Sequence, residues 1–329
     1  MPEQRNDQIE LDGATGADIK KLAGLPLRSL VLKRPEFKFT AAIGQVLQSL
    51  PLEHLALDWN SELAKHPACL NGLARLSSLK MAHAGFNEEC LAAIAKLKLR
   101  RLDIAASSIS EEGLAHLAGM PLESLSLEGA RYLESLRGTL RALRGLPLRN
   151  LNLADLNCFS NDDLAELKGF RLEGLDLGLN DVTVEGLAHL AGLPLKRLGL
   201  AFVGPLPGSA LQLIADLGLP LEDLDLSGAE FEDADLAGLR RLPLKTLRLH
   251  ETPWLTDAGV LQLGGLPLRN LTIGAGPGES RITDACLPVL TTLPLEELWL
   301  PNCTGISAKG WAELAALPAR VAGPGIPQV

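Results

Sequence analysis

A six-residue apolar pattern, LxxLxL, recurs along this chain at steps of 23 to 27 residues. Twelve copies occupy most of the 329 residues, and two stretches, 113–127 and 186–200, are nearly identical. A period of this length indicates a repeat protein, in which each unit buries its apolar side only against its neighbours. The chain is therefore expected to form one continuous array rather than two domains. The copies begin at Leu27, Leu52, Leu76, Leu99, Leu122, Leu148, Leu172, Leu195, Leu221, Leu244, Leu268 and Leu295.

Each unit divides into two halves with different apolar periods. In LESLSL (122–127) the apolar residues alternate at the end, which is typical of a short strand with one buried face. In GLAHLAGMP (113–121) Leu114 and Leu117 are followed by a glycine and Pro121, which is typical of a short helix and its end. Stacked units of this kind place a parallel sheet on the inside of a curved solenoid and helices on the outside.

The unit resembles the leucine-rich repeat, LxxLxLxxN followed by a helical half, over about nine-tenths of the chain. The stretches ISEEGLAHL (109–117), LTDAGVLQL (255–263) and ITDACLPVL (282–290) resemble the cysteine-containing and GALA-type variants, familiar from F-box-type proteins and bacterial effectors. The resemblance implies an α/β fold, a right-handed solenoid or horseshoe with a concave parallel β-sheet and convex short helices. Asn60, Asn180 and Cys303 keep the family's ninth position and several other units do not, so the side-chain ladder there is expected to be patchy.

Both ends of the chain look like degenerate repeats. Residues 1–26, with Ile9 and Leu11, are expected to form an N-terminal cap that is a half-repeat. Residues 27–303 are assigned to the twelve repeats, and residues 304–329 to a C-terminal cap and tail. Terminal repeats need a polar outer face, so the loss of leucines at both ends is expected.

Composition narrows the classes of function. The net charge of −9 argues against nucleic acid and anionic membranes as partners, because both require clustered Lys and Arg. The five cysteines are odd in number and form no CxxC pair, so reduced thiols are expected. The first residues lack the apolar region of a secretory signal. We therefore expect a cytoplasmic monomer, or a protein delivered into a host cytosol if it is an effector.

Signatures of catalysis are missing from the sequence. No GxSxG, GxxxxGK[ST] or HExxH motif is present, so we predict no catalytic residue, no metal and no cofactor, and a protein that is not an enzyme. His54, Asp58 and His83 fall on adjacent units and are interpreted as solvated surface residues rather than metal ligands. The second residue of successive units mostly alternates in charge, as in Arg100 and Glu123, which we interpret as support for register and solubility.

The concave face is the candidate binding surface. Positions three, five, seven and eight of each unit lie on the inner sheet or just past it, outside the core. In the six central units these positions include six acids and two arginines, so a partner with a basic surface is expected. Aromatic side chains among polar residues are typical anchors of protein interfaces. The predicted partner-binding residues are Trp59, His83, Asp103, Glu128, Asn152, Asp155, Asp176, Phe202, Asp225, Arg248 and Trp299.

These features predict a non-enzymatic scaffold that binds a partner protein on its concave face, and the GALA-type resemblance adds a bacterial effector-like role. The alternative is the specificity module of an enzyme, or a divergent member of one, such as a ubiquitin-ligase-associated leucine-rich repeat protein. Arg137, Arg141 and Arg144 occur at helical spacing and form a second candidate surface on an outer helix.

Overall fold

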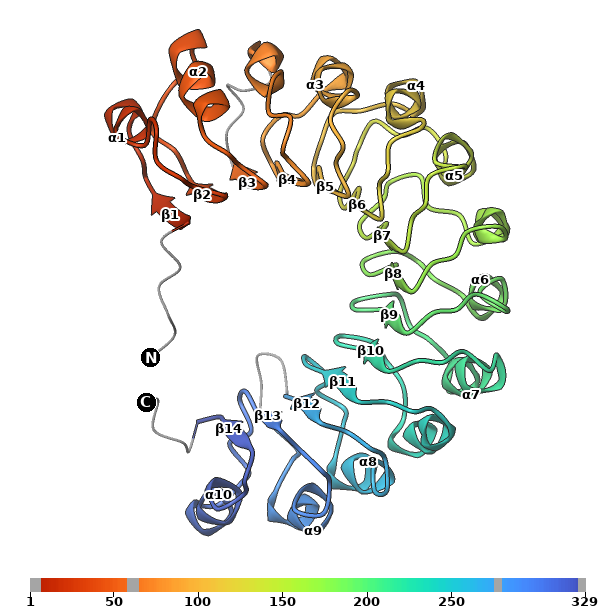
Figure 1. Cartoon of the computed structure of the whole chain (residues 1–329). Helices are drawn as coiled ribbons and strands as arrows, with labels where there is room; N and C mark the ends of the chain where they lie inside the picture. The colour runs from red at the N-terminus through yellow and green to blue at the C-terminus, as the bar shows by residue number, and fades with distance from the viewer. Residues whose placement is uncertain (1–6, 58–64, 275–279, 325–329) are drawn as a thin grey trace. The chain divides into compact units, whose positions relative to one another are not determined.

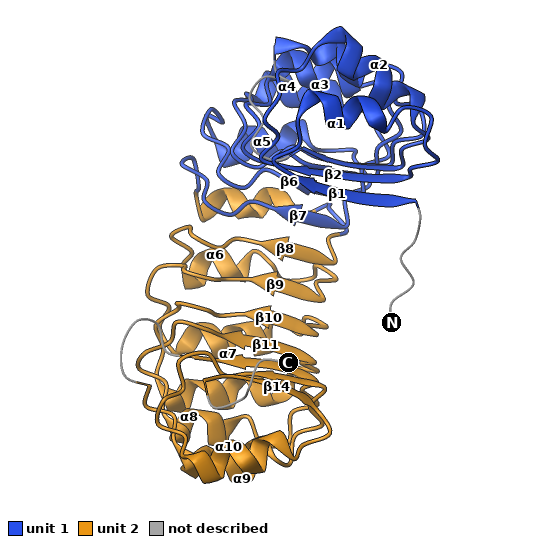
Figure 2. Ribbon diagram, turned by 90° about the vertical axis from the view of Figure 1, so that its left-hand side faces the viewer, with its two compact units in different colours: residues 1–159, 169–171 blue, residues 160–168, 172–329 orange. Residues whose placement is uncertain are grey.

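The computed structural model describes residues 7–57, 65–274 and 280–324, which form two compact units. Unit 1 comprises residues 1–159 and 169–171, and unit 2 comprises residues 160–168 and 172–329 (Figure 2). Trp59, Asp58 and Asn60 lie outside the described residues. The strands and helices of each unit follow one another in chain order (Figure 1).

Unit 1 contains seven parallel strands, each hydrogen-bonded to the next, among its described residues. The strands are β1 (Gln8–Asp12), β2 (Ser29–Lys33), β3 (His54–Leu57), β4 (Ser78–Lys80), β5 (Arg101–Asp103), β6 (Ser124–Ser126) and β7 (Asn150–Asn152). Its helices are α1 (Gly16–Lys21), α2 (Ala41–Ser49), η2 (Pro67–Leu70), α3 (Glu88–Ile94), α4 (Glu111–Leu114), η3 (Ala115–Leu117) and α5 (Leu136–Ala142), where η marks a 3₁₀ helix.

Unit 2 repeats the same arrangement with seven further parallel strands in its described part. The strands are β8 (Gly174–Asp176), β9 (Arg197–Gly199), β10 (Asp223–Asp225), β11 (Thr246–Leu249), β12 (Asn270–Ile273), β13 (Glu297–Trp299) and β14 (Arg320–Ala322). Its helices are η4 (Asp162–Leu167), α6 (Val184–Ala188), α7 (Ser209–Asp216), η5 (Asp233–Arg241), α8 (Asp257–Gln262), η6 (Asp284–Cys286), α9 (Leu287–Leu290) and α10 (Ala308–Ala315).

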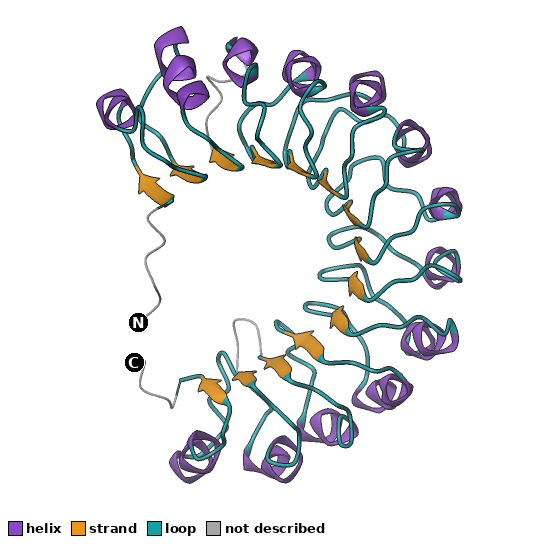
Figure 3. Ribbon diagram, viewed as in Figure 1, coloured by secondary structure: helices purple, strands orange, loops and turns teal. Residues whose placement is uncertain are grey.

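The central leucine of each strand sets the register. Leu175 pairs with Leu198, and Leu198 pairs with Leu224, so equivalent leucines of successive repeats stack into one apolar column. All three are at most 2% exposed. Within each unit the strands line the inner side and the helices cover the outer side (Figure 3). The predicted α/β solenoid of leucine-rich repeats, with a parallel sheet inside and short helices outside, is confirmed.

The alternating charges at the second position form ion pairs between neighbouring repeats, as expected from the sequence. Lys196 Nζ lies 3.0 Å from Glu173 Oε2, and Lys245 Nζ lies 2.8 Å from Glu222 Oε2. Arg28–Glu53, Arg100–Glu123 and Arg269–Glu296 are further pairs of this row. All are solvent-exposed, so each contributes little to stability and mainly supports the register.

An acidic side chain at the start of one helix accepts hydrogen bonds from the residue that precedes the helix of the next repeat. Asp233 accepts hydrogen bonds from the N–H (3.0 Å) and hydroxyl (2.5 Å) of Thr256. Asp284 does the same for Ser307, at 2.8 and 2.5 Å. The Ser307 hydroxyl and N–H hold the pKa of Asp284 below its usual value. The stack is therefore tied together at the helix N-termini as well as through its leucines.

The patchy ladder expected at the ninth position is confirmed. Buried Asn180 donates from Nδ2 to the carbonyls of Leu177 (3.0 Å) and Gly178 (3.1 Å). Thr252 donates its hydroxyl to the Leu249 carbonyl (2.8 Å), whereas buried Ser107 Oγ has no partner. Among the described helices, none has both the length and the apolar character needed to cross a bilayer.

Candidate partner-binding surfaces

In the part of the chain that the structure describes, the turns after most of the strands have a left-handed residue at the eighth position of the repeat. These residues have φ between 43° and 60°, and none of them is buried. They are Arg34, His83, Ala106, Asp155, Leu179, Phe202, Glu251 and Asn302, and glycines stand at three further copies of this position. Backbone hydrogen bonds to the next repeat hold the turn, as from Phe202 N–H to the Ser227 carbonyl (2.7 Å). The eighth position therefore presents its side chain to solvent along the edge of the sheet.

Four of the predicted binding residues also stabilise these turns. Asp103, Asn152, Asp176 and Asp225 stand at the fifth position, and each accepts a hydrogen bond from the N–H two residues later. The distances are 3.2 Å to Ala105, 2.9 Å to Ala154, 2.9 Å to Gly178 and 3.0 Å to Ser227. The sequence interpretation missed this role, although an Asp or Asn just before a turn is its usual signal.

In unit 1 the structure brings three predicted binding residues together. Asn152 donates from Nδ2 to Glu128 Oε2 (3.1 Å), and Asp155 lies on the turn that follows Asn152. Arg131 reaches to 3.8 Å from Asp155, which offsets part of the negative charge of this group. His83 is not part of this group of three and is exposed on the turn after β4. Among the described residues, no three His, Cys, Asp or Glu side chains form a possible metal site.

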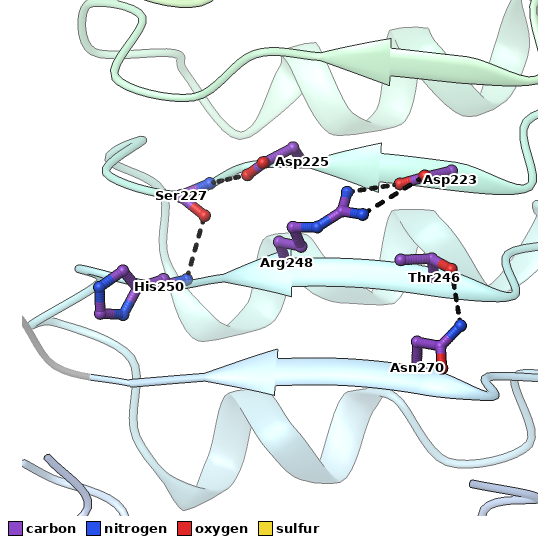
Figure 4. A network of polar contacts seen from close by, with 7 residues as sticks. All are labelled: Asp223, Asp225, Ser227, Thr246, Arg248, His250 and Asn270. Atoms are coloured by element: carbon purple, nitrogen blue, oxygen red, sulfur yellow. Dashed lines mark hydrogen bonds and ion pairs between the residues drawn. The ribbon is translucent and has the colours of Figure 1, made fainter. Parts of the chain in front are cut away.

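In unit 2 the predicted binding residue Arg248 is held by a neighbouring acid. Its guanidinium lies 2.7 Å and 3.5 Å from the two carboxylate oxygens of Asp223 (Figure 4). Ser227 Oγ accepts a hydrogen bond from the backbone N–H of His250 (3.3 Å), and Asn270 Nδ2 donates to Thr246 Oγ1 (3.3 Å). The Arg248–Asp223 ion pair neutralises one of the six acids counted on the concave face. Asp176 and Asp225 are two further carboxylates on the strands of unit 2.

Trp299 forms the most exposed aromatic surface on the strands of unit 2. Trp299 is 52% exposed. Its ring stacks on the His250 ring, with the two centroids 6.0 Å apart and the planes at 18°. Beside it lies a hollow of about 310 Å³, lined among others by Asn270, Thr272 and Arg320. An exposed ring, hydrogen-bonding side chains and a hollow thus occur together, as at the anchors of protein interfaces. Phe202 is not part of this group, because it lies on the turn after β9.

The buried thiols do not form a nucleophilic site. Cys286 and Cys303 are fully buried. Burial raises the pKa of Cys286 to about 12 and that of Cys303 to about 11. Both groups are therefore neutral at pH 7, and their small side chains fill space in the core.

Comparison with known proteins supports the fold. No protein-family profile and no curated protein sequence matches the chain. A chain of the yeast Rad7–Elc1 complex is similar in structure, with a TM-score of 0.65 and 17% identity over 87% of this chain and 82% of that chain. That likeness shows the leucine-rich-repeat fold.

Two further solved structures are less similar. An internalin (InlF) from Listeria monocytogenes has a TM-score of 0.48 and 18% identity over 88% of this chain and 86% of that chain. A chain of the mouse RP105/MD-1 complex has a TM-score of 0.47 and 18% identity over 95% of this chain and 58% of that chain.

Proposed function

We propose that this protein is a non-enzymatic scaffold that binds a partner protein on the concave strand face of its repeats. The exposed ring of Trp299, stacked on His250 beside the hollow at β12–β14, is the observation that supports this function best. A flat aromatic surface that is already held in place loses little conformational entropy on binding. The similar yeast chain comes from a structure of two proteins, Rad7 and Elc1, which agrees with an interaction role.

The proposed partner carries a basic surface next to the segment that contacts Trp299. Asp176 and Asp225 keep their carboxylates on the concave face, and salt should weaken their attraction for such a partner. The GALA-type resemblance of the helical halves favours an effector-like protein that acts in a cytoplasm, its own or that of a host. We propose that it does so as a monomer.

Affinity purification with a matched pair of variants tests this function. Trp299→Ala removes the anchor, whereas Tyr132→Ala removes an aromatic side chain that is 65% exposed in unit 1. A partner recovered by wild-type protein is identified by mass spectrometry, purified and titrated calorimetrically against all three proteins. We expect Trp299→Ala to weaken binding by about tenfold or more and Tyr132→Ala to leave it unchanged. A partner that binds the Trp299→Ala protein with wild-type affinity would exclude this face as the site.

A further inference from the structure

We propose that unit 2 has a second interaction surface, the edge formed by its turns after β8, β9 and β10, and that it binds a peptide segment with apolar residues flanked by Lys or Arg. We call this surface the turn edge and define it as residues 178–181, 201–204 and 227–232. The inference rests on the proposed scaffold function but places a different partner segment at a different position.

Two large apolar side chains occur side by side on the turn edge. Leu179 is 54% exposed and Phe202 is 43% exposed. The Leu179 N–H donates to the Ala201 carbonyl (2.8 Å), so the two turns are direct neighbours. Strand spacing of about 4.8 Å brings successive eighth positions within reach of one apolar side chain of a partner. Such an adjacent pair of exposed apolar residues is a natural contact point for another protein.

The Phe202 ring is supported from below by the next turn. A Cβ atom built on Gly228 would lie 2.3 Å from a ring carbon, so the ring occupies the space next to the backbone at that glycine. Gly228 has φ of +68° and bonds through its N–H to the His250 carbonyl (2.8 Å). The ring is therefore positioned before any partner arrives, and little side-chain freedom remains to be lost on binding.

The charge around the two apolar residues is of one sign. The turn edge contains three acidic residues, Asp181, Glu230 and Glu232, and no Lys or Arg. Asp181 and Glu230 are exposed on the turn edge itself. A segment with Lys or Arg beside its apolar residues complements this field, whereas an acidic segment is repelled. The charge pattern thus selects a basic, apolar peptide as the occupant.

Asparagine variants separate binding from folding at this edge. Asn302 occupies the eighth position of its own repeat at φ 60°, which shows that Asn suits this backbone. Large apolar residues adopt left-handed φ at a cost, and Asn does so more readily. Leu179→Asn with Phe202→Asn should therefore remove the apolar contact without lowering the melting temperature. Leu261→Ala, at a residue 42% exposed on α8, is the matched control.

The test uses two fluorescein-labelled synthetic peptides with the same Leu-Phe-Leu centre, flanked in one by lysines and in the other by glutamates. Fluorescence anisotropy should show saturable binding of the lysine peptide only, weakened about tenfold or more by the double Asn variant and unchanged by Leu261→Ala. Equal binding of both peptides, no saturable binding, or wild-type affinity of the double variant would each overturn the proposal. Loss of binding through Trp299→Ala alone would overturn it too, while leaving the concave-face function intact.

Discussion

At the scale of single residues, two carboxylates of the concave face stabilise turns, and we propose that they also attract a partner. Asp225 Oδ1 accepts the Ser227 N–H at 3.0 Å, and Asp176 Oδ1 accepts the Gly178 N–H at 2.9 Å. Each carboxylate also carries a negative charge, which would attract a basic partner. A substitution that reverses the charge therefore also removes a turn hydrogen bond, and the two effects must be separated.

Asp225→Asn and Asp225→Lys make that separation. Asn keeps the amide oxygen as an acceptor, as Asn152 does for the Ala154 N–H (2.9 Å). Lys has no acceptor, so Asp225→Lys should lower the free energy of unfolding by about 0.5–1.5 kcal/mol, and Asp225→Asn should change it little. Urea unfolding followed by circular dichroism measures both. Equal stability of the two variants would show that the turn hydrogen bond contributes nothing.

At the scale of elements, the helix N-termini explain why a glycine or another small residue precedes the first large apolar residue of the helix. The acidic cap of one repeat lies over the first turn of the next helix. At Gly259 a Cβ atom would lie 2.3 Å from Asp233 Oδ1 and 2.5 Å from Leu255 Cδ1. The glycine thus makes room for the carboxylate that binds the N–H and hydroxyl of Thr256.

Gly259→Ala should therefore destabilise the protein, against the ordinary preference of helices for Ala over Gly of about 1 kcal/mol. The methyl group must displace Asp233 and weaken its two hydrogen bonds to Thr256, so we expect a fall in melting temperature of several degrees. Gly264→Ala is the control, because the nearest atom to its Cβ would be at 3.4 Å. A Gly259→Ala protein that melts at or above the wild-type temperature would contradict the proposal that Gly259 makes room for Asp233.

At the scale of the whole molecule, the stack of leucine columns should make unfolding cooperative. Each repeat buries its leucines only against its neighbours, so loss of one repeat exposes two others. The described residues cluster into two compact units, and the prediction of a single cooperative array remains to be measured. Three of the four tryptophans, Trp254, Trp299 and Trp311, belong to unit 2, which provides a probe for that unit.

Leu175→Asp tests this cooperativity from the core of β8, where the leucine is 2% exposed. An unpaired buried charge costs several kcal/mol, which is a large part of a typical stability of about 5–15 kcal/mol. We expect the melting temperature to fall steeply by both tryptophan fluorescence and circular dichroism. In the wild-type protein, the two probes should give one coincident transition. Separate transitions would show that the two units unfold independently, and an unchanged melting temperature of the variant would contradict the strand register.

The sequence alone determined the period, the strand–helix alternation and the leucine register, because these depend on apolar spacing within each repeat. It also predicted the ion pairs of the second position, because strands in register bring equivalent residues of neighbouring repeats together. Only the tertiary structure revealed the left-handed backbone at Leu179 and Phe202, since neither residue carries the usual glycine or asparagine signal. The pairing of Arg248 with Asp223 likewise depends on contacts between residues on neighbouring repeats, which spacing within one repeat does not report. These contacts decide which polar groups of the concave face are left for a partner.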